Sequence, residues 1–159
     1  MEIRPGLSAE KTIVVGPEHV AAHLGSGGVP VYATPSMILH IEETARMVVE
    51  PLLDEGLSTV GASIQAEHLA PTPPGMTVRL RAELVKVEGR FLTFSVEVWD
   101  EVEKVGQASH VRAIIDLRRF ADKVARKAEA ARKAATTGAA ATAGGAVPSA
   151  EILEQNHDA

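Results

Sequence analysis

A single long helical pattern constrains the fold of this chain more than any other feature. Thr34 and Pro35 form a typical helix start, because threonine is a favoured N-cap and proline suits the first helical position. Apolar residues then recur at helical spacing up to Gly56, a plausible C-terminal end. They are Met37, Ile38, Ile41, Ala45, Val48, Leu52 and Leu53. A helix of about 20 residues is about 30 Å long, so it can lie across a whole sheet.

Strand patterns surround this helix on both sides. A short β-branched run, residues 11–15, precedes it. Four further patterns follow without another helix between them, and they cover residues 58–70, 77–88, 92–98 and 105–117. The last three are separated by short turns, which is typical of antiparallel hairpins. One strand, one long helix and four more strands predict an α+β fold, with an antiparallel sheet wrapped around a central helix.

The C-terminal part has a different composition. Residues 118–133, RRFADKVARKAEAARK, predict a basic helix from their alanine, lysine, arginine and glutamate content. Residues 134–150 are low in complexity and lack large apolar side chains, so we expect disorder there. We therefore place one domain in residues 1–127 and a disordered tail in residues 128–159.

Composition and charge exclude several functional classes. The chain has no cysteine, which removes disulfides, thiolate nucleophiles and cysteine-based metal sites. Aromatic residues make up only 3% and the net charge is −5, which argues against a nucleic-acid-binding module. No apolar run is long enough to span a membrane, and the N-terminus has no hydrophobic signal core. We expect a cytoplasmic protein that binds neither nucleic acid nor membrane.

Residues 61–75, GASIQAEHLAPTPPG, predict a strand that carries one histidine on its apolar face and ends at a proline-rich turn. Because strand side chains alternate, the predicted apolar row contains Val60, Ala62, Ile64, Ala66 and His68. Two interpretations of His68 remain open here. It is either a functional imidazole or a buried histidine that is hydrogen-bonded to the backbone.

Four stretches together resemble one family of enzymes. They are VYATPSMILHIEETA at the helix start, GASIQAEHLAPTPPG, the ELVKVEGR hairpin and the ASHVRAIIDLRRF strand end. Over residues 31–123 the chain is similar to hot-dog-fold acyl-CoA thioesterases, specifically the fluoroacetyl-CoA thioesterase-like family. The resemblance implies a homodimer with active sites at the subunit seam, which hydrolyses an acyl-CoA thioester. We expect no metal site and no cofactor besides the CoA of the substrate.

The resemblance also implies roles for individual residues. Thr34, Glu42 and His68 match the family's catalytic set, Gly61 matches a glycine that helps to hold the acyl group, and Arg112 matches a site arginine. Each has a plainer alternative. Thr34 is also a helix cap, Glu42 a solvated helix residue and Gly61 a β-bulge, and Arg112 can form an ion pair with Asp116 on the same strand face.

Further polar residues have weaker signals. Arg118, Arg119 and Lys123 are candidates for contacts with the CoA phosphates, although any basic helix has such residues. His110 has no predicted role, and a histidine on the strand surface is its simplest interpretation. The remaining histidines His19, His23 and His40 do not have the spacing of a metal site.

The segment before the helix departs from the family pattern. Fluoroacetyl-selective members have bulky aromatic residues there, whereas residues 23–29 are HLGSGGV. We therefore expect a thioesterase without strong fluoroacetyl selectivity. Two other functions remain as alternatives, a non-catalytic acyl-CoA-binding module and, ranked lower, a hot-dog hydratase or dehydratase.

Overall fold

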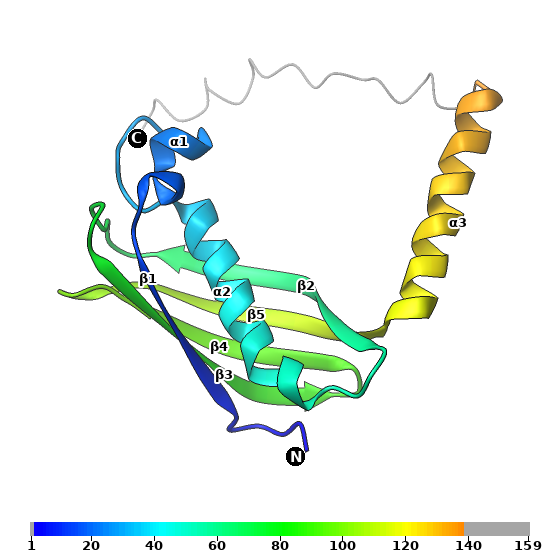
Figure 1. The fold of residues 1–159 in the computed structure, drawn as a ribbon, viewed down its shortest axis with the longest axis horizontal. Helices are drawn as coiled ribbons and strands as arrows, with labels where there is room; N and C mark the ends of the chain where they lie inside the picture. Colours follow the sequence, from blue (N-terminus) through cyan, green and yellow to red (C-terminus); the bar gives the residue numbers. More distant parts are fainter. Residues whose placement is uncertain (1, 139–159) are drawn as a thin grey trace, which may run out of the picture. The chain divides into compact units, whose positions relative to one another are not determined.

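The computed structural model describes residues 2–138. Residues up to Arg118 form one compact unit and those from Arg119 onward form another. The first unit is a five-stranded antiparallel sheet with strand order β1-β3-β4-β5-β2 (Figure 1). The strands are β1 (Ser8–Val14), β2 (Leu57–His68), β3 (Thr77–Glu88), β4 (Phe91–Trp99) and β5 (Lys104–Asp116). The predicted α+β architecture is therefore confirmed, and β2 lies at an edge of the sheet.

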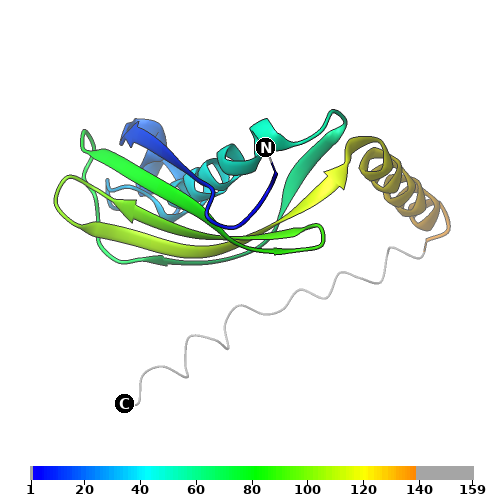
Figure 2. The same cartoon turned by 90° about the horizontal axis from the view of Figure 1, so that it is seen from below.

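One helix, α2 (Thr34–Val49), crosses a single face of this sheet (Figures 1 and 2). Two short elements precede it, η1 (Pro17–His19) and α1 (Ala21–Leu24). The prediction that the helix continues to Gly56 was wrong, because a 3-10 turn, η2 (Glu50–Leu52), replaces its last part. Pro51 explains the early end, since proline has no N–H for the helical hydrogen bond and its ring clashes with the carbonyl four residues earlier.

The core lies between α2 and the sheet. Leu39 and Met47 of α2 are exposed, whereas its apolar residues Met37, Ile41, Ala45, Val48 and Val49 recur with helical period and are buried, as expected for an amphipathic helix. They pack against alternate residues of the two central hairpin strands, and the buried set includes Met37, Ile41, Ala45, Leu80, Leu84, Leu92, Phe94 and Val96. This packing holds α2 against the sheet, and α2 carries two of the predicted site residues.

A register shift in β2 changes which of its residues face α2. Gly61 pairs with Arg112 but Ser63 pairs with Val111, so one residue of β2 is left without a partner on β5. An extra residue inverts the alternation of side chains beyond it. Thr59 and Gly61 face α2 before the shift, and Ile64 and His68 do so after it. The prediction that Val60 and Ala62 share the face of His68 was wrong for this reason.

The second unit contains the basic helix predicted from composition. Helix α3 (Leu117–Thr136) begins at the end of β5 and runs beyond Lys133, the last residue predicted to be helical. The remainder of the predicted disordered tail, residues 139–159, lies outside the described residues. Among the helices of residues 2–138, none is long and apolar enough to cross a membrane.

Gly106 provides a test of how tightly α2 packs on the sheet. It pairs with His68, and a Cβ at this position would lie 2.5 Å from Met37 Sδ and 3.3 Å from the Glu67 carbonyl oxygen. We expect Gly106→Ala to lower the free energy of unfolding by about 1–3 kcal/mol, because overpacking a close-packed core is costly. Urea denaturation measures this change.

The control is Gly28→Ala, at a position where an added Cβ meets nothing within 4 Å. It should be neutral or slightly stabilising. In a Met37→Ala background the penalty of Gly106→Ala should shrink, since the added methyl group then has room. Equal penalties in both backgrounds would show that helix packing does not limit this position.

Candidate active site

Thr34 and His68 form the first cluster of predicted site residues. Thr34 Oγ1 lies 2.8 Å from His68 Nδ1. The helix cap is Ala33, which has extended backbone and makes no side-chain capping bond, while Thr34 is the first helical residue. The interpretation of Thr34 as a plain N-cap was therefore wrong. Its exposed hydroxyl contacts the imidazole at the end of β2 instead.

His68 is held in a form that suits proton transfer. Burial lowers the pKa of this imidazole, and the backbone of Ala70 opposes that shift in part. The ring is therefore neutral and able to accept a proton near neutral pH. Its Nε2 atom is buried and has no hydrogen-bond partner among the described residues. A polar ring atom left without a protein partner is available to a substrate or a water molecule.

An apolar cavity of about 420 Å³ adjoins this pair. Its walls include Val29, Val31, Leu69 and Ala70, together with Thr34 and His68 themselves. Part of the glycine-rich segment before α2 therefore contributes to the wall. A mostly apolar hollow with a few converging polar groups is the usual form of a small-molecule site.

Glu42, Gly61 and Arg112 form the second cluster. Arg112 is 5% exposed and donates from Nε to Thr59 Oγ1 (2.9 Å) and from Nη2 to the Thr59 carbonyl (3.0 Å). Its Nη1 lies 3.8 Å from Glu42 Oε2. A Cβ on Gly61 would lie 3.5 Å from Glu42 Oε1, so glycine leaves open space beside this carboxylate. Gly61 also adjoins the register shift. Its position is therefore compatible both with a β-bulge and with a glycine that leaves space beside Glu42 for a ligand.

His110 is a member of this cluster that sequence reasoning missed. It is 1% exposed, so the interpretation as a strand-surface histidine was wrong. Its Nδ1–H donates to the Ser63 carbonyl (2.8 Å) and its Nε2 accepts from Arg112 Nη1 (3.2 Å). Burial lowers the pKa of His110, and the positive charge of Arg112 lowers it further. The Ser63 carbonyl and the negative charge of Glu42 act in the opposite direction, but the net shift is downward. The available signal was strand alternation, which places His110 on the same face of β5 as Arg112.

The two clusters lie apart along α2. Glu42 is eight residues beyond Thr34, which corresponds to about 12 Å along the helix axis. Within one chain the structure therefore brings Thr34 to His68, and Glu42 to Gly61 and Arg112. Both clusters lie along β2, whose outer edge has no partner strand within residues 2–138.

The other predicted substrate contacts lie on α3. Arg118 and Arg119 are exposed in its first turn, and Lys123 is exposed one turn later. Their proposed contact with CoA phosphates remains a prediction, since the structure describes the part beyond Arg118 as a separate unit.

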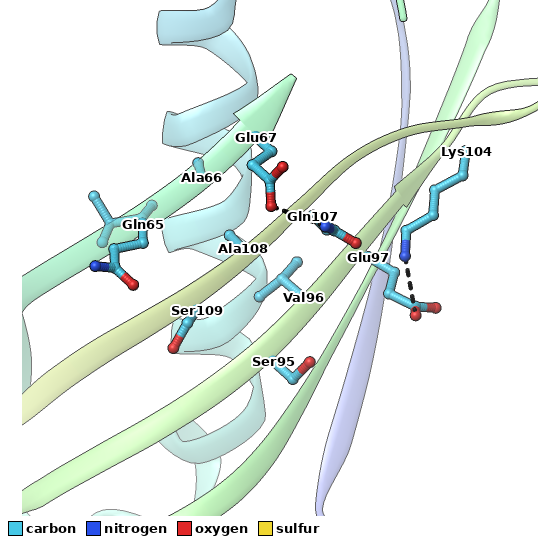
Figure 3. Close-up of a pocket in the computed structure, with 11 residues that line it drawn as sticks. Gln65, Ala66, Glu67, Ser95, Val96, Glu97, Lys104, Gln107, Ala108 and Ser109 are labelled. Carbon is cyan, nitrogen blue, oxygen red and sulfur yellow. Dashed lines mark hydrogen bonds and ion pairs between the residues drawn. The ribbon is translucent and has the colours of Figure 1, made fainter. Parts of the chain in front are cut away.

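A wider hollow, of about 600 Å³, lies over β2, β4 and β5 and contains none of the predicted residues (Figure 3). Polar side chains cover much of it, with a Gln107–Glu67 hydrogen bond and a Lys104–Glu97 ion pair. It is larger than the cavity beside His68, but its carboxylates are already paired and it contains no histidine. The chemistry therefore points to the smaller cavity.

Comparison with known proteins identifies the family of the chain. A family model described as fluoroacetyl-CoA-specific thioesterase (FlK) matches residues 15–118. The fluoroacetyl-CoA thioesterase of Streptantibioticus cattleyicolor is 40% identical over 100 residues, which cover 63% of this chain and 72% of that protein. A solved structure of the fluoroacetyl-CoA thioesterase FlK is 35% identical, with a TM-score of 0.73, and covers 80% of this chain and 98% of that chain.

A second solved structure extends the comparison beyond this enzyme. A Thermus thermophilus hypothetical protein, a thioesterase superfamily member, is 32% identical, with a TM-score of 0.77 over 83% of this chain and 98% of that one. The chain therefore belongs to the fluoroacetyl-CoA-specific thioesterase family. The resemblance inferred from the sequence, the hot-dog fold and the assignment as a thioesterase are confirmed.

The buried histidines predict how stability depends on pH. Burial lowers the pKa of His40, His68 and His110 in the folded protein, whereas the unfolded chain has ordinary values near 6.5. Below about pH 6.5 the unfolded state therefore binds more protons, and the free energy of unfolding falls with decreasing pH. This stabilisation is fully present above that pH and is lost as the pH drops through the folded pKa values.

Substitution separates the contribution of His110. For each protein, the quantity to compare is the decrease in the free energy of unfolding from pH 7 to pH 5. This decrease should be smaller in His110→Gln than in the wild type. His23→Gln, at an exposed position, is the matched control substitution. Chemical denaturation at several pH values measures this decrease, and an identical decrease in His110→Gln and the wild type would contradict the assignment.

Proposed function

We propose that the protein hydrolyses a short- or medium-chain acyl-CoA thioester to the free acid and CoA, using Thr34, Glu42 and His68 in a homodimer. The observation that carries this proposal is the 2.8 Å contact between Thr34 Oγ1 and His68 Nδ1 beside an apolar cavity. Family membership supports the reaction class. Solved structures of the relative FlK contain acetyl-CoA in one case and fluoroacetate with CoA in another.

Each residue type suits one step of thioester hydrolysis. Neutral His68 accepts a proton from the attacking oxygen, which belongs either to Thr34 or to a water molecule that Thr34 positions. The protonated imidazole then returns the proton to the departing CoA sulfur. If Thr34 is the attacking group, this leaves an acyl ester on Thr34, which a water molecule hydrolyses with His68 again as the base. Thr34 is the first residue of α2, and the dipole at a helix start favours negative charge of the kind that develops on the thioester oxygen.

A homodimer would bring the two clusters together. The outer edge of β2 offers unpaired backbone groups, and pairing with a second copy is a common way to satisfy such an edge. If two β2 strands pair antiparallel about a two-fold axis at Gln65, this residue lies opposite its own copy, and the extra residue after Gly61 lets His68 lie opposite the partner's Gly61. Glu42 and Arg112 of one subunit then serve Thr34 and His68 of the other. Within one chain the two clusters are about 12 Å apart along α2, which makes it difficult for them to act together. The paired arrangement therefore supports a site shared between the subunits.

Loss of the proton carrier tests the mechanism. We expect His68→Ala to lower kcat/KM by about 10²–10⁴-fold, the usual contribution of a general acid or base. Thiol release from a panel of short, branched and aromatic acyl-CoAs measures the rate. His23→Ala, at an exposed position on α1, should retain full activity. Wild-type turnover in a folded His68→Ala protein would exclude the proposed role, and thioester binding without any hydrolysis by the wild type would favour the binding-module alternative.

Mixed dimers test which subunit supplies each residue. When inactive His68→Ala and inactive Glu42→Gln chains are unfolded together and refolded, half of the dimers should be mixed. A site shared between subunits gives each mixed dimer one intact site, so activity should recover to about a quarter of the wild-type value. No recovery would mean that each chain supplies a complete set. Light scattering that finds only monomers at micromolar concentration would contradict the dimer itself.

Selectivity should be modest. Ser26, Gly27 and Val29 line the cavity where the resemblance implied aromatic gating residues. A small substituent in an apolar pocket changes binding by only about 1–3 kcal/mol, which corresponds to about 10–200-fold. We therefore expect activity on several short acyl-CoAs and a preference for fluoroacetyl-CoA over acetyl-CoA within that range. Steady-state kcat/KM values for this pair are the measurement, and a preference above about 10⁴-fold would require a discriminating group other than the cavity wall.

A further inference from the structure

Tyr32 lies directly behind the candidate catalytic histidine and has no role in the reaction described above. It is 1% exposed, and its backbone N–H donates to the Thr72 carbonyl (2.8 Å). Its ring is nearly perpendicular to that of His68, at 78°, with 6.2 Å between the ring centroids. Tyr32 also lines the same cavity as Thr34 and His68. The ring therefore forms one wall against which the imidazole packs.

Besides Tyr32, the ring of His68 interacts with the Ala70 backbone and with Thr34. Thr34 Oγ1 contacts Nδ1, and Nε2 has no hydrogen-bond partner among the described residues. One hydrogen bond does not fix the rotation of an imidazole about its outer side-chain torsion, which has a broad energy profile. A half-turn of the ring would put carbon Cδ2 in the place of Nδ1 and so remove the contact with Thr34. Edge-to-face packing against an aromatic ring restricts that rotation.

Tyr32 is itself held from the opposite side by His40. The Tyr32 hydroxyl lies 2.6 Å from His40 Nδ1, and the two rings are stacked with 8° between their planes. Burial raises the pKa of Tyr32, and the negative charge of Glu43 raises it further. The hydroxyl therefore stays protonated and donates a hydrogen bond to His40. Burial lowers the pKa of His40, so this ring is neutral and its Nδ1 can accept the hydrogen bond. His40 is 5% exposed on α2, and the ring of His19 packs edge-on against it.

We propose that Tyr32 is a positioning residue for His68, and that its hydrogen bond to His40 holds the Tyr32 ring in the required place. The proposal rests on the proposed function in one respect, namely that His68 carries the proton. It assigns no chemistry to the Tyr32 hydroxyl, which is directed to His40 and away from the reaction. Removal of the Tyr32 ring should therefore lower turnover directly. Removal of the hydroxyl alone should lower turnover only because the hydrogen bond to His40 that holds the ring is lost.

Three variants separate these contributions. Tyr32→Leu removes the ring, and we expect kcat to fall about 10²-fold with little change in KM, as for a catalytic group displaced by about 1 Å. Tyr32→Phe keeps the ring but leaves buried His40 Nδ1 without its donor, so kcat should fall by a smaller factor. The double variant Tyr32→Phe/His40→Leu replaces both polar partners by apolar ones, which restores a packed pair and should recover most of the lost kcat. Phe91→Leu, at an exposed aromatic residue of β4, is the control for replacing an aromatic ring by leucine.

Nuclear magnetic resonance of the His68 imidazole supplies a readout that does not depend on activity. In Tyr32→Leu the ring should lose its single orientation and become more hydrated, so its pKa should rise toward the ordinary value and the acid limb of the kcat/KM profile should move to higher pH. Unchanged His68 resonances in Tyr32→Leu, or a change in KM alone, would overturn the proposal. Failure of the double variant to recover kcat would overturn it too, by showing that the hydroxyl takes part in the reaction.

Two further outcomes distinguish a failure of the positioning role of Tyr32 from a failure of the proposed hydrolytic function. If the wild type hydrolyses no acyl-CoA, the proposed function fails, and the His68 resonances still decide whether Tyr32 orients the ring. If Tyr32→Leu does not fold, Tyr32→Phe and the double variant decide the matter. A His68 spectrum in Tyr32→Phe identical to that of the wild type, together with wild-type kcat, would then overturn the proposal.

Discussion

The register shift in β2 is the constraint on which the site depends. A strand with strict alternation places residues an even number apart on the same face, and Gly61 and His68 are seven apart. Without the extra residue between Gly61 and Ser63, one of the two would face away from α2. The shift lets Thr59 and Gly61 meet Arg112 and Glu42 while His68 still meets Thr34. A local departure from ideal pairing thus assembles both clusters on one face of the sheet.

Arg112 shows how a nearly buried charge is accommodated in this fold. Thr59 supplies a hydroxyl and a carbonyl oxygen, His110 supplies a ring nitrogen, and Glu42 supplies the opposite charge at 3.8 Å. Removing any of these acceptors would leave a buried cation less well compensated, which is costly. His110 can accept only while it is neutral, and the charge of Arg112 helps to keep it so. The Ser63 carbonyl at the register shift fixes the tautomer by accepting from Nδ1. The bulge, the histidine and the arginine are therefore interdependent.

The fold was predictable because its signals are periodic and local. The helix start at Thr34-Pro35 and the alternating strands of residues 77–88 and 92–98 each fit a single period, and the structure contains them close to the predicted bounds. The errors occur where one residue changes the geometry. Pro51 ends α2 early, and an unpaired residue after Gly61 inverts the face of the strand. Periodicity averages over a segment, so it does not detect a bulge of one residue.

The arrangement of the candidate site could not be predicted from the sequence alone. Thr34 and His68 are 34 residues apart in the chain, and only the resemblance suggested that they meet. His110 was missed because a strand histidine has no distinctive neighbours in the sequence, and its partners at Ser63 and Arg112 depend on the register of β2 with β5. Register between distant strands is set by the packing of the whole face, which no short segment encodes. From the sequence, Tyr32 had no role and His40 was considered only as a metal ligand, because their contact likewise depends on tertiary packing.

The exposure of Glu42 adds a physical argument for a shared site. Its side chain is 41% exposed, although it lies beside nearly buried Arg112 and the open space at Gly61. An ion pair with one partner in solvent contributes little to stability, so this pair is poorly explained as a structural feature of one chain. If a second copy covers β2, Glu42 loses solvent and its interaction with Arg112 strengthens as the local dielectric falls. The same event encloses the Thr34–His68 pair. Association and completion of the site would then depend on the same edge strand, so substitutions that weaken the β2 edge should lower activity and dimer affinity together.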